Sequence, residues 1–239
     1  MNALIALVRW DAILQARNGF YWATAFVVVV MGALLLNVPE GARADRAVWV
    51  PALLAINLQI TTFFFVAGLI LLERDEGTLT ALAVSPLSPG IYFAARTITL
   101  TMLAAVETIA IVWIAFGMEG SWGFILSGTV ALGVMYTGFG AAIATRYESV
   151  NAMLLPASVC VAALLLPLLP HFGLAPRVVF LLHPTEPALT LIRAGYGSAT
   201  TGEVGFGFVG AILWGTLTYW LGLRSVAGLM RDTRATGGR

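Results

Sequence analysis

The sequence predicts an all-α integral membrane protein with six transmembrane helices and both termini in the cytoplasm. Of its 239 residues, 59% are apolar and only 10% are charged, and the mean hydropathy is +0.91. A soluble domain keeps roughly a quarter of its residues charged. Because a helix needs about 20 apolar residues to cross a bilayer, six crossings leave no room for a separate soluble domain.

Six long apolar runs mark the expected crossings. They are residues 20–38, 48–72, 91–117, 122–145, 151–169 and 206–223. Backbone amides must be paired within the chain inside lipid, so runs of this length are expected to be helices. The first run is not a cleaved signal peptide, because it follows a polar stretch containing Arg9, Asp11 and Arg17 and lacks a cleavage pattern.

Arginine placement predicts the side on which the termini lie. Basic residues near span ends stay in the cytoplasm, and nine of the 13 arginines fall on the side of the termini. These are Arg9, Arg17, Arg74, Arg96, Arg146, Arg224, Arg231, Arg234 and Arg239, against Arg43, Arg46, Arg177 and Arg193 on the other side. We therefore expect a multi-pass protein of the cell membrane with cytoplasmic termini.

The basic and metal-ligating residues exclude several kinds of site. All 13 basic residues are arginine, and a P-loop needs a lysine on the terminal phosphates, so this chain cannot hydrolyse ATP by that route. Cys160 is the single cysteine, and His171 and His183 stand apart from any ligand at metal-binding spacing. We expect no catalytic residue, no metal, no bound cofactor and no nucleic-acid partner.

The junction between the second and third spans carries strong local signals. Two Ser-Pro pairs occur at residues 85–86 and 88–89. In each pair the serine is a favourable N-cap residue, and the proline is favourable at the first position of a helix. One helix is therefore expected to end before residue 86 and another to begin near residue 89. Residues 75–83 are expected to form a short cytoplasmic helix, with Leu79 and Leu82 on one face.

The densest polar cluster lies just before that helix, at Glu73-Arg74-Asp75-Glu76-Gly77-Thr78. Three carboxylates at the C-terminal end of a helix oppose its dipole, so a partner or a new helix start is expected to compensate them. Gly77 allows the chain to turn, because glycine adopts positive φ freely. From the residues alone, a solvated cap and a docking surface for a partner both stay open.

The same segment resembles a signature of ABC-2 type exporter permeases. Residues 73–79, followed by Val-Ser-Pro-Leu-Ser-Pro at 84–89 and Ala95-Arg96, are similar to that family's E-R-[DE]-x-G-T-[LM] and V-[ST]-P-[LI] patterns. The resemblance implies one transmembrane domain over residues 1–239: an interfacial segment (1–19), a six-span region (20–223) and a cytoplasmic tail (224–239). It also implies a homodimer, or a heterodimer with a related permease, docked on two copies of a cytoplasmic ABC ATPase that binds ATP and Mg.

In that family the short helix is a coupling helix seated on the ATPase. The residues that carry this role by resemblance are Glu73, Arg74, Asp75, Glu76, Gly77, Thr78, Leu79 and Leu82. Residues 3–18 match the family's interfacial connecting helix, although their polar side chains do not gather on one side of a helical wheel. Between the last two spans, the apolar pieces 177–183 and 187–196 are each too short to cross. They are expected as interfacial or re-entrant helices, with a surface loop as the alternative.

Glu107 lies at the centre of the third span, where an ionisable group costs about 3 kcal/mol on insertion scales. One interpretation is a carboxyl group bonded to a neighbouring helix, and the other is a contact with substrate or protons. The candidate transport-path residues are Glu107, Asn57, Gln59 and Thr61. The last three are equally suited to holding helices together through hydrogen bonds.

The leading functional hypothesis is the permease subunit of an ATP-driven efflux pump for a hydrophobic or amphipathic small molecule, either a drug-like compound or a lipid. Such a subunit is not itself an enzyme. Two alternatives stay open. One is an intramembrane lipid-modifying enzyme that uses Glu107, His171 or His183. The other is a proton-coupled carrier that uses Glu107.

Overall fold

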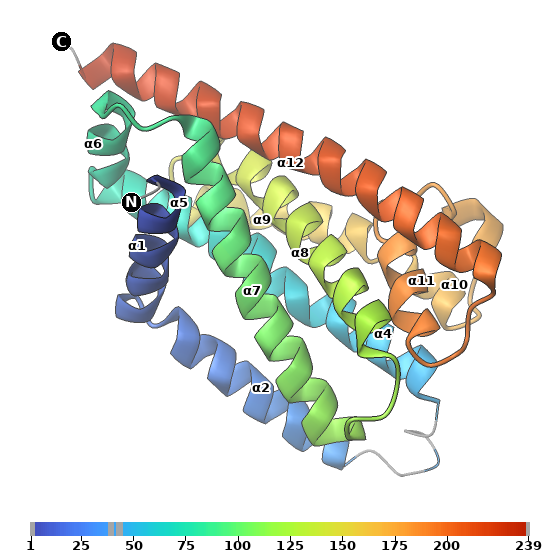
Figure 1. Cartoon of the computed structure of the whole chain (residues 1–239). Coiled ribbons are helices and arrows are strands. Elements are labelled where there is room, and N and C mark those ends of the chain that lie inside the picture. The colour runs from blue at the N-terminus through green and yellow to red at the C-terminus, as the bar shows by residue number, and fades with distance from the viewer. Residues whose placement is uncertain (1–2, 38–40, 42–44, 238–239) are drawn as a thin grey trace.

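The computed structural model describes residues 3–37, 41 and 45–237, and every regular element in that part of the chain is helical. The N-terminus, the C-terminus and the short helix α6 (Thr78–Val84) lie at one end of the molecule, and α10 and α11 lie at the other (Figure 1). Long helices connect the two ends. The first and last described residues therefore lie at the same end of the molecule.

Four helices in the described part of the chain are long and apolar enough to cross a membrane. They are Arg46–Asp75, α7 (Pro89–Phe116), α8 (Trp122–Ala144) and the Thr201–Ala235 part of α12 (Thr201–Gly237). A fifth candidate is the pair α1 (Ala3–Arg17) and α2 (Phe20–Leu36), which is bent by 66°. The described residues therefore contain four or five candidate spans, against the six that the sequence predicts.

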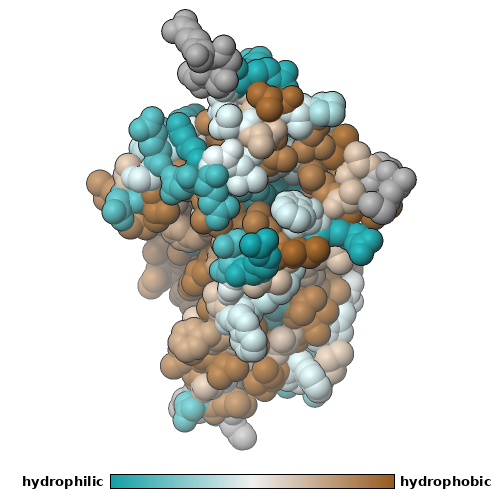
Figure 2. Space-filling model, turned by 90° about the vertical axis from the view of Figure 1, so that its left-hand side faces the viewer, coloured by the Kyte–Doolittle hydropathy of each residue, from teal (hydrophilic) through white to brown (hydrophobic). Residues whose placement is uncertain are grey.

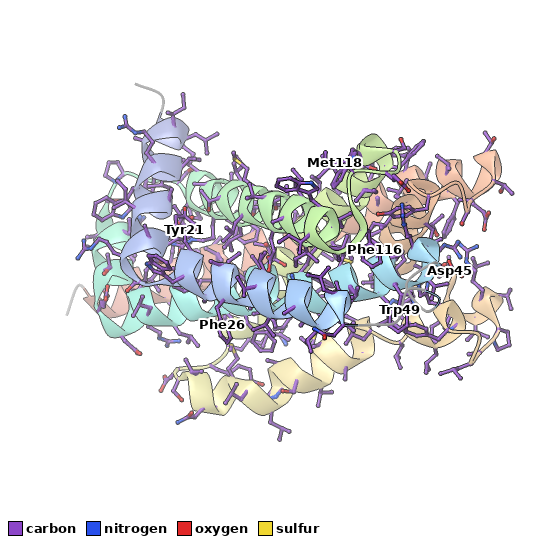
Figure 3. The ribbon with its side chains drawn as sticks, turned by 90° about the horizontal axis from the view of Figure 1, so that it is seen from below. Tyr21, Phe26, Asp45, Trp49, Phe116 and Met118 are labelled. Atoms are coloured by element: carbon purple, nitrogen blue, oxygen red, sulfur yellow. The ribbon has the colours of Figure 1, made fainter. Side chains whose placement is uncertain are left out.

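The helix at the fifth predicted span, α9 (Val150–Leu164), has 15 residues, fewer than the about 20 that a crossing needs. Proline lacks the N–H that would continue the helix, and Pro167 lies just beyond its end before α10 (Leu168–His171) begins. α9 lies at the edge of the molecule (Figure 3, pale yellow), with Leu155 76% exposed. Most of its surface is free to contact lipid or another chain.

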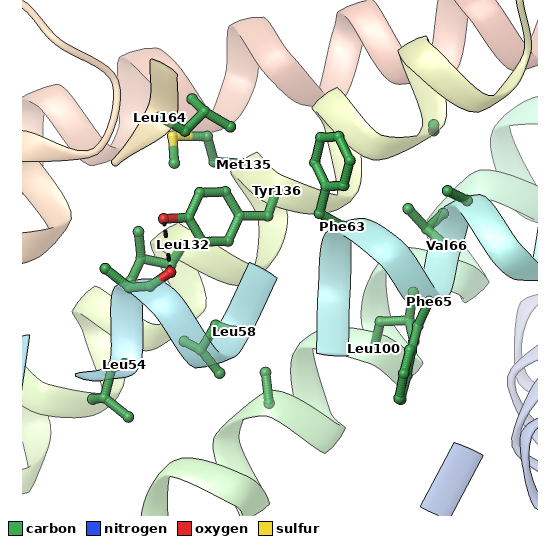
Figure 4. Packing of buried hydrophobic residues seen from close by; sticks show 14 of the residues in the cluster. Leu54, Leu58, Phe63, Phe65, Val66, Leu100, Leu132, Met135, Tyr136 and Leu164 are labelled. Atoms are coloured by element: carbon green, nitrogen blue, oxygen red, sulfur yellow. Dashed lines mark hydrogen bonds between the residues drawn. The ribbon is translucent and has the colours of Figure 1, made fainter. Parts of the chain in front are cut away.

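The Arg46–Asp75 helix is the centre of the fold. It consists of α4 (Arg46–Leu58), a π-helical segment η1 (Gln59–Phe64) and α5 (Phe65–Asp75). Its most apolar part is 72% buried, against 17% for α12. Four residues before η1, the Tyr136 hydroxyl of α8 donates to the Ala55 carbonyl at 3.2 Å (Figure 4).

Small residues allow α8 and α12 to pack closely. A Cβ atom at Gly138 would lie 2.3 Å from the Thr218 carbonyl oxygen, and one at Gly222 would lie 3.0 Å from the Gly138 Cα. Such contacts are typical of helix pairs in membranes, where van der Waals packing drives association. α12 is therefore fixed to α8 along a glycine-lined seam.

The predicted helix boundaries around α6 are confirmed. α6 ends at Val84, and α7 begins at Pro89, where the Ser88 hydroxyl accepts a hydrogen bond from the Ile91 N–H at 3.2 Å. Gly77 makes the turn before α6 with φ +71°. One detail differs: Asp75 ends α5 instead of opening the short helix, so that helix begins at Thr78.

The segment between α10 and α12 divides into two kinds of structure. The 3-10 turn η2 (Arg177–Phe180) is on the surface, whereas α11 (Glu186–Ala194) is buried against α8, α12 and α4. The first apolar piece therefore lies on the surface of the protein, as both the interfacial and the surface-loop interpretation expect, and the surface-loop interpretation is wrong for the second. Two arginines used to predict orientation, Arg43 and Arg239, lie outside the described residues.

Candidate functional site

A buried ion-pair network joins three helices next to α6. Arg96 of α7 lies between Asp11 of α1 and Glu73 of α5. Its Nε atom is 3.0 Å from Asp11 Oδ1 and its Nη2 atom is 2.5 Å from Glu73 Oε1. All three side chains are 3–4% exposed. Removing charges from water costs several kcal/mol per ion unless they are well paired. Because separating the helices would break these buried pairs, the network holds the three helices together.

Neutral side chains add hydrogen bonds to the network, although Arg96 Nη1 has no hydrogen-bond partner among the described residues. The Tyr92 hydroxyl donates to Glu73 Oε2, and the Arg96 guanidinium lies 5.2 Å from the centre of the Tyr92 ring. Gln15 Nε2 donates to Asp11 Oδ2 and to Thr99 Oγ1, each at 2.9 Å. Each carboxylate therefore has hydrogen bonds in addition to its ion pair, as buried charges require.

The network turns the polar face of α1 inward. Asp11 and Gln15 lie four residues apart on one face of the helix and are buried. Trp10 and Ile13 are each 50% exposed on its outer surface. The poor separation of polar and apolar side chains along residues 3–18 therefore has a structural cause, because α1 buries Asp11 and Gln15 against α7 while Arg9 and Arg17 stay exposed.

The structure divides the acidic cluster into an inner and an outer part. Glu73 is buried in the network, so it is not part of a charged surface as the sequence suggested, and Arg96 is the partner that compensates it. Asp75 and Glu76 are exposed. Arg74 donates to the Tyr147 carbonyl at 3.0 Å and lies 3.7 Å from Glu148.

The remaining predicted coupling residues form the base and inner face of α6. Gly77 makes the turn, and the Thr78 hydroxyl lies 3.5 Å from Glu76 Oε2. Leu79 is buried in the main hydrophobic cluster. Leu82 lines a small cavity together with Glu73 and Arg96. α6 is therefore packed directly on the ion-pair network.

Sequence reasoning missed Tyr92 and Thr99 of α7 and also Asp11 and Gln15 of α1, which both bond to Thr99, more than 80 positions away. The signal that could have indicated Asp11 and Gln15 is a pair of polar residues four apart in an otherwise apolar helix. Arg96 was noted only as part of the signature. Its position on the buried face of α7 depends on tertiary packing.

Comparison with known proteins identifies the family. Residues 2–229 match the model of the Fluoroquinolones export permease protein family. The chain belongs to this family. Similar proteins include two Fluoroquinolones export permease proteins of Mycobacterium tuberculosis, from strains CDC 1551 / Oshkosh and ATCC 25618 / H37Rv. Each is 28% identical over 244 residues, which cover 100% of this chain and 96% of the relative.

Membership in this export permease family confirms the resemblance to ABC-2 type exporter permeases. Together with the apolar helices, it also confirms a multi-pass protein of the cell membrane. The relatives are named as permeases rather than enzymes.

A second polar site lies in the middle of the permease. Asn57 Nδ2 donates to Glu107 Oε1 at 2.7 Å, and the Thr61 hydroxyl donates to Glu107 Oε2. The structure thus brings three of the four predicted path residues together, with Thr61 presented by the π-helical η1. Gln59 instead lies 3.5 Å from the Val161 carbonyl of α9. All four are at most 2% exposed.

A third polar cluster lies at the end opposite the termini. Arg177 of η2 pairs with Glu186 of α11 at 2.5 Å and with Glu203 of α12, and its Nη2 donates to Thr190 at 2.7 Å. Burial opposes the charged form, but the bonds to Glu186 and Glu203 raise the pKa of Arg177 above its usual value. This cluster fixes η2, α11 and the start of α12 to one another.

The two histidines do not form a metal site in the described part of the chain. His171 Nε2 lies 2.6 Å from the Val48 carbonyl, and His183 Nδ1 lies 2.8 Å from the Thr185 hydroxyl. The described residues contain no group of three His, Cys, Asp or Glu side chains that could hold a metal. His171 thus contacts the backbone of α4, and His183 contacts the backbone of α9 and the hydroxyl of Thr185 just before α11.

Proposed function

We propose that this permease is the transmembrane subunit of an ATP-driven exporter that moves a hydrophobic or amphipathic small molecule, such as a fluoroquinolone, out of the cytoplasm. Family membership supports export, and the names of the relatives support the choice of a fluoroquinolone as probe. The apolar helices suit an amphipathic substrate.

One structural observation carries the proposal: the buried pairing of Arg96 with Asp11 and Glu73 beside α6. A force applied to α6 reaches α1, α5 and α7 together, because separating these charges inside the protein would leave them uncompensated. α6 is thus suited to pass movement of a bound partner to the helices on either side of it.

The partner is a separate ABC ATPase in two copies, which binds ATP and Mg. A chain without lysine cannot supply the P-loop lysine itself. The exposed residues of α6 and its preceding turn form the contact face, and Asp75 and Glu76 contribute its negative charge. The permease pairs with a second copy or with a related permease.

The arrangement in the bilayer has six crossings with both termini in the cytoplasm. α9 and α10 together make the fifth crossing, and α1 lies along the cytoplasmic membrane surface, where its exposed Trp10 and Ile13 contact lipid. Glu107, Asn57, Gln59 and Thr61 border the transport path when the helices around them separate.

Capture of the ATPase tests the proposal. The permease is purified with the P-loop ATPase that accompanies it, identified by mass spectrometry, and reconstituted for ATP-driven fluoroquinolone transport. Charge reversal of Asp75 and Glu76 to Arg is expected to abolish capture. Asp45→Arg, an exposed acid at the opposite end, is the control and should leave capture unchanged. ATP-driven transport by the permease alone would disprove the proposal.

Cysteine labelling tests the orientation. In a Cys160→Ala background, Asp75→Cys is expected to react with a membrane-impermeant maleimide only after cells are opened, whereas Glu119→Cys reacts in intact cells. Glu119 is 76% exposed at the end opposite α6. Labelling of Asp75→Cys in intact cells would place α6 outside the cell and contradict the coupling role.

A further inference from the structure

The last helix continues well past the membrane. α12 has 37 residues, about 55 Å at 1.5 Å per residue, and a crossing needs only about 20 residues. The Arg224 guanidinium lies 5.0 Å from the Trp220 ring centre, and tryptophan favours the headgroup layer. We place the membrane surface at these two residues, and Arg234 lies about 15 Å further along the helix than Arg224.

The projecting part of α12 is packed against α6. Val226 and Met230 are buried in the main hydrophobic cluster, and Arg234 follows on the same face, four residues later. Arg234 Nε donates to the Ala83 carbonyl at 2.8 Å, and Nη2 donates to the same oxygen. The last carbonyls of a helix lack intrahelical donors and attract cations, so Arg234 caps the end of α6.

A hollow of about 670 Å³ lies beside this contact. It is lined by residues 84–89, which form the turn between α6 and α7, and by Arg234 of α12. Val84 is 63% exposed at its edge. Figure 1 shows the C-terminal end of α12 next to α6, and Figure 2 shows hydrophilic side chains interspersed with apolar ones over this end of the molecule.

We propose that this hollow is a second contact with the ATPase, separate from the outer face of α6, and that Arg234 sets its shape by fixing α12 to the end of α6. The inference rests on the proposed function above. The occupant is a segment of the ATPase with an apolar side chain for Val84 and a carboxylate for Arg234, the α12 residue that lines the hollow.

Position favours a protein over a lipid as the occupant. The hollow is continuous with the exposed face of α6, which is the proposed ATPase contact. The headgroup layer is only about 5–8 Å thick on each side of the hydrocarbon. Arg234, about 15 Å beyond the level of Arg224 along the helix, is therefore out of reach of lipid headgroups.

A charge-matched pair of variants tests the role of Arg234. Arg234→Ala removes the cap on α6, and Arg231→Ala removes an equal charge from an exposed position of the same helix. Binding of the purified ATPase to the full-length permease in nanodiscs is measured by titration. Loss of a charge-assisted bond predicts about tenfold weaker binding for Arg234→Ala and less than about twofold for Arg231→Ala. Equal affinities would overturn the inference.

Photo-crosslinking tests the hollow while leaving Arg234 intact. p-Benzoylphenylalanine at Val84 or at Ala235 is expected to crosslink to the ATPase, and the same group at Leu217, an exposed position in the membrane part of α12, is not. Crosslinks from Val84 or Ala235 to lipid or to a second permease alone would overturn the inference. If the Asp75 and Glu76 reversals block capture but these sites never crosslink to the ATPase, the inference fails and the proposed function stands. If wild-type permease captures no ATPase, both fail.

Discussion

Arg96 and Glu73 form an ion pair that joins the two ends of the α6 hairpin, which consists of the end of α5, α6 and the start of α7. They lie 23 positions apart in the chain, one on each side of α6, and are joined at 2.5 Å with both side chains 3% exposed. The two ends of the hairpin, its base, are therefore held together by opposite charges. Asp11 of α1 is bound to the same Arg96 guanidinium. The first prediction concerns this base.

Removing Arg96 should destabilise the permease strongly. Arg96→Ala leaves Asp11 and Glu73 as buried carboxylates without their cation, which costs about 3–5 kcal/mol. We expect a large fall in the thermal unfolding midpoint in nanodiscs. The control is Arg74→Ala, which loses an ion pair with Glu148, 90% exposed, and a hydrogen bond to the Tyr147 carbonyl, at a cost of about 1–2 kcal/mol. Equal midpoints for the two variants would show that the network is not structurally important.

The close packing of α8 and α12 at Gly138 predicts that a Gly→Ala substitution there has the opposite effect on stability from the same substitution at Gly228, outside this contact. Gly138→Ala would place a Cβ 2.3 Å from a backbone oxygen of α12, so the helices must separate, at a cost of about 1–3 kcal/mol. Gly228→Ala has no atom within 4 Å of the new Cβ and should gain up to about 1 kcal/mol from helix propensity. Thermal unfolding checks both, and a stable Gly138→Ala would contradict the close approach.

The Arg177 cluster, at the end opposite the termini, predicts a contrast between two arginines. Arg177→Ala leaves Glu186, whose side chain is 5% exposed, without its ion pair, and should lower the free energy of unfolding by about 1–3 kcal/mol. Arg46→Ala removes an arginine whose partner Glu119 is 76% exposed, with an expected loss below about 1 kcal/mol. Similar losses for both would mean that α11 does not depend on Arg177.

Local signals predicted the hairpin well. The end of α6, the start of α7 and the turn at Gly77 follow from Ser-Pro pairs and from glycine, whose effects act within a few residues. The core of each long apolar run could also be predicted as helix, because helix formation inside lipid is enforced by the lack of water.

Features that depend on distant contacts could not be predicted. Hydropathy falls after residue 223, yet α12 continues to Gly237, with Val226 and Met230 buried in the main cluster and Arg234 bound to α6. The inward polar face of α1 likewise needs Arg96, which is 85 positions from Asp11. A single sequence gives no information about such pairs, so the network could be seen only in the structure.

The last prediction separates packing from transport at Glu107. Glu107→Gln keeps an acceptor for Asn57 and an amide for Thr61, so the unfolding midpoint should stay near that of wild type. Glu107→Leu leaves both partners buried without a bond and should cost about 1–3 kcal/mol for each. If Glu107 borders the path, as proposed, its charge or proton matters, and Glu107→Gln should lower ATP-driven fluoroquinolone transport in reconstituted vesicles several-fold. If Glu107→Gln folds well and transports at the wild-type rate, the Glu107 carboxyl group has a role in packing alone.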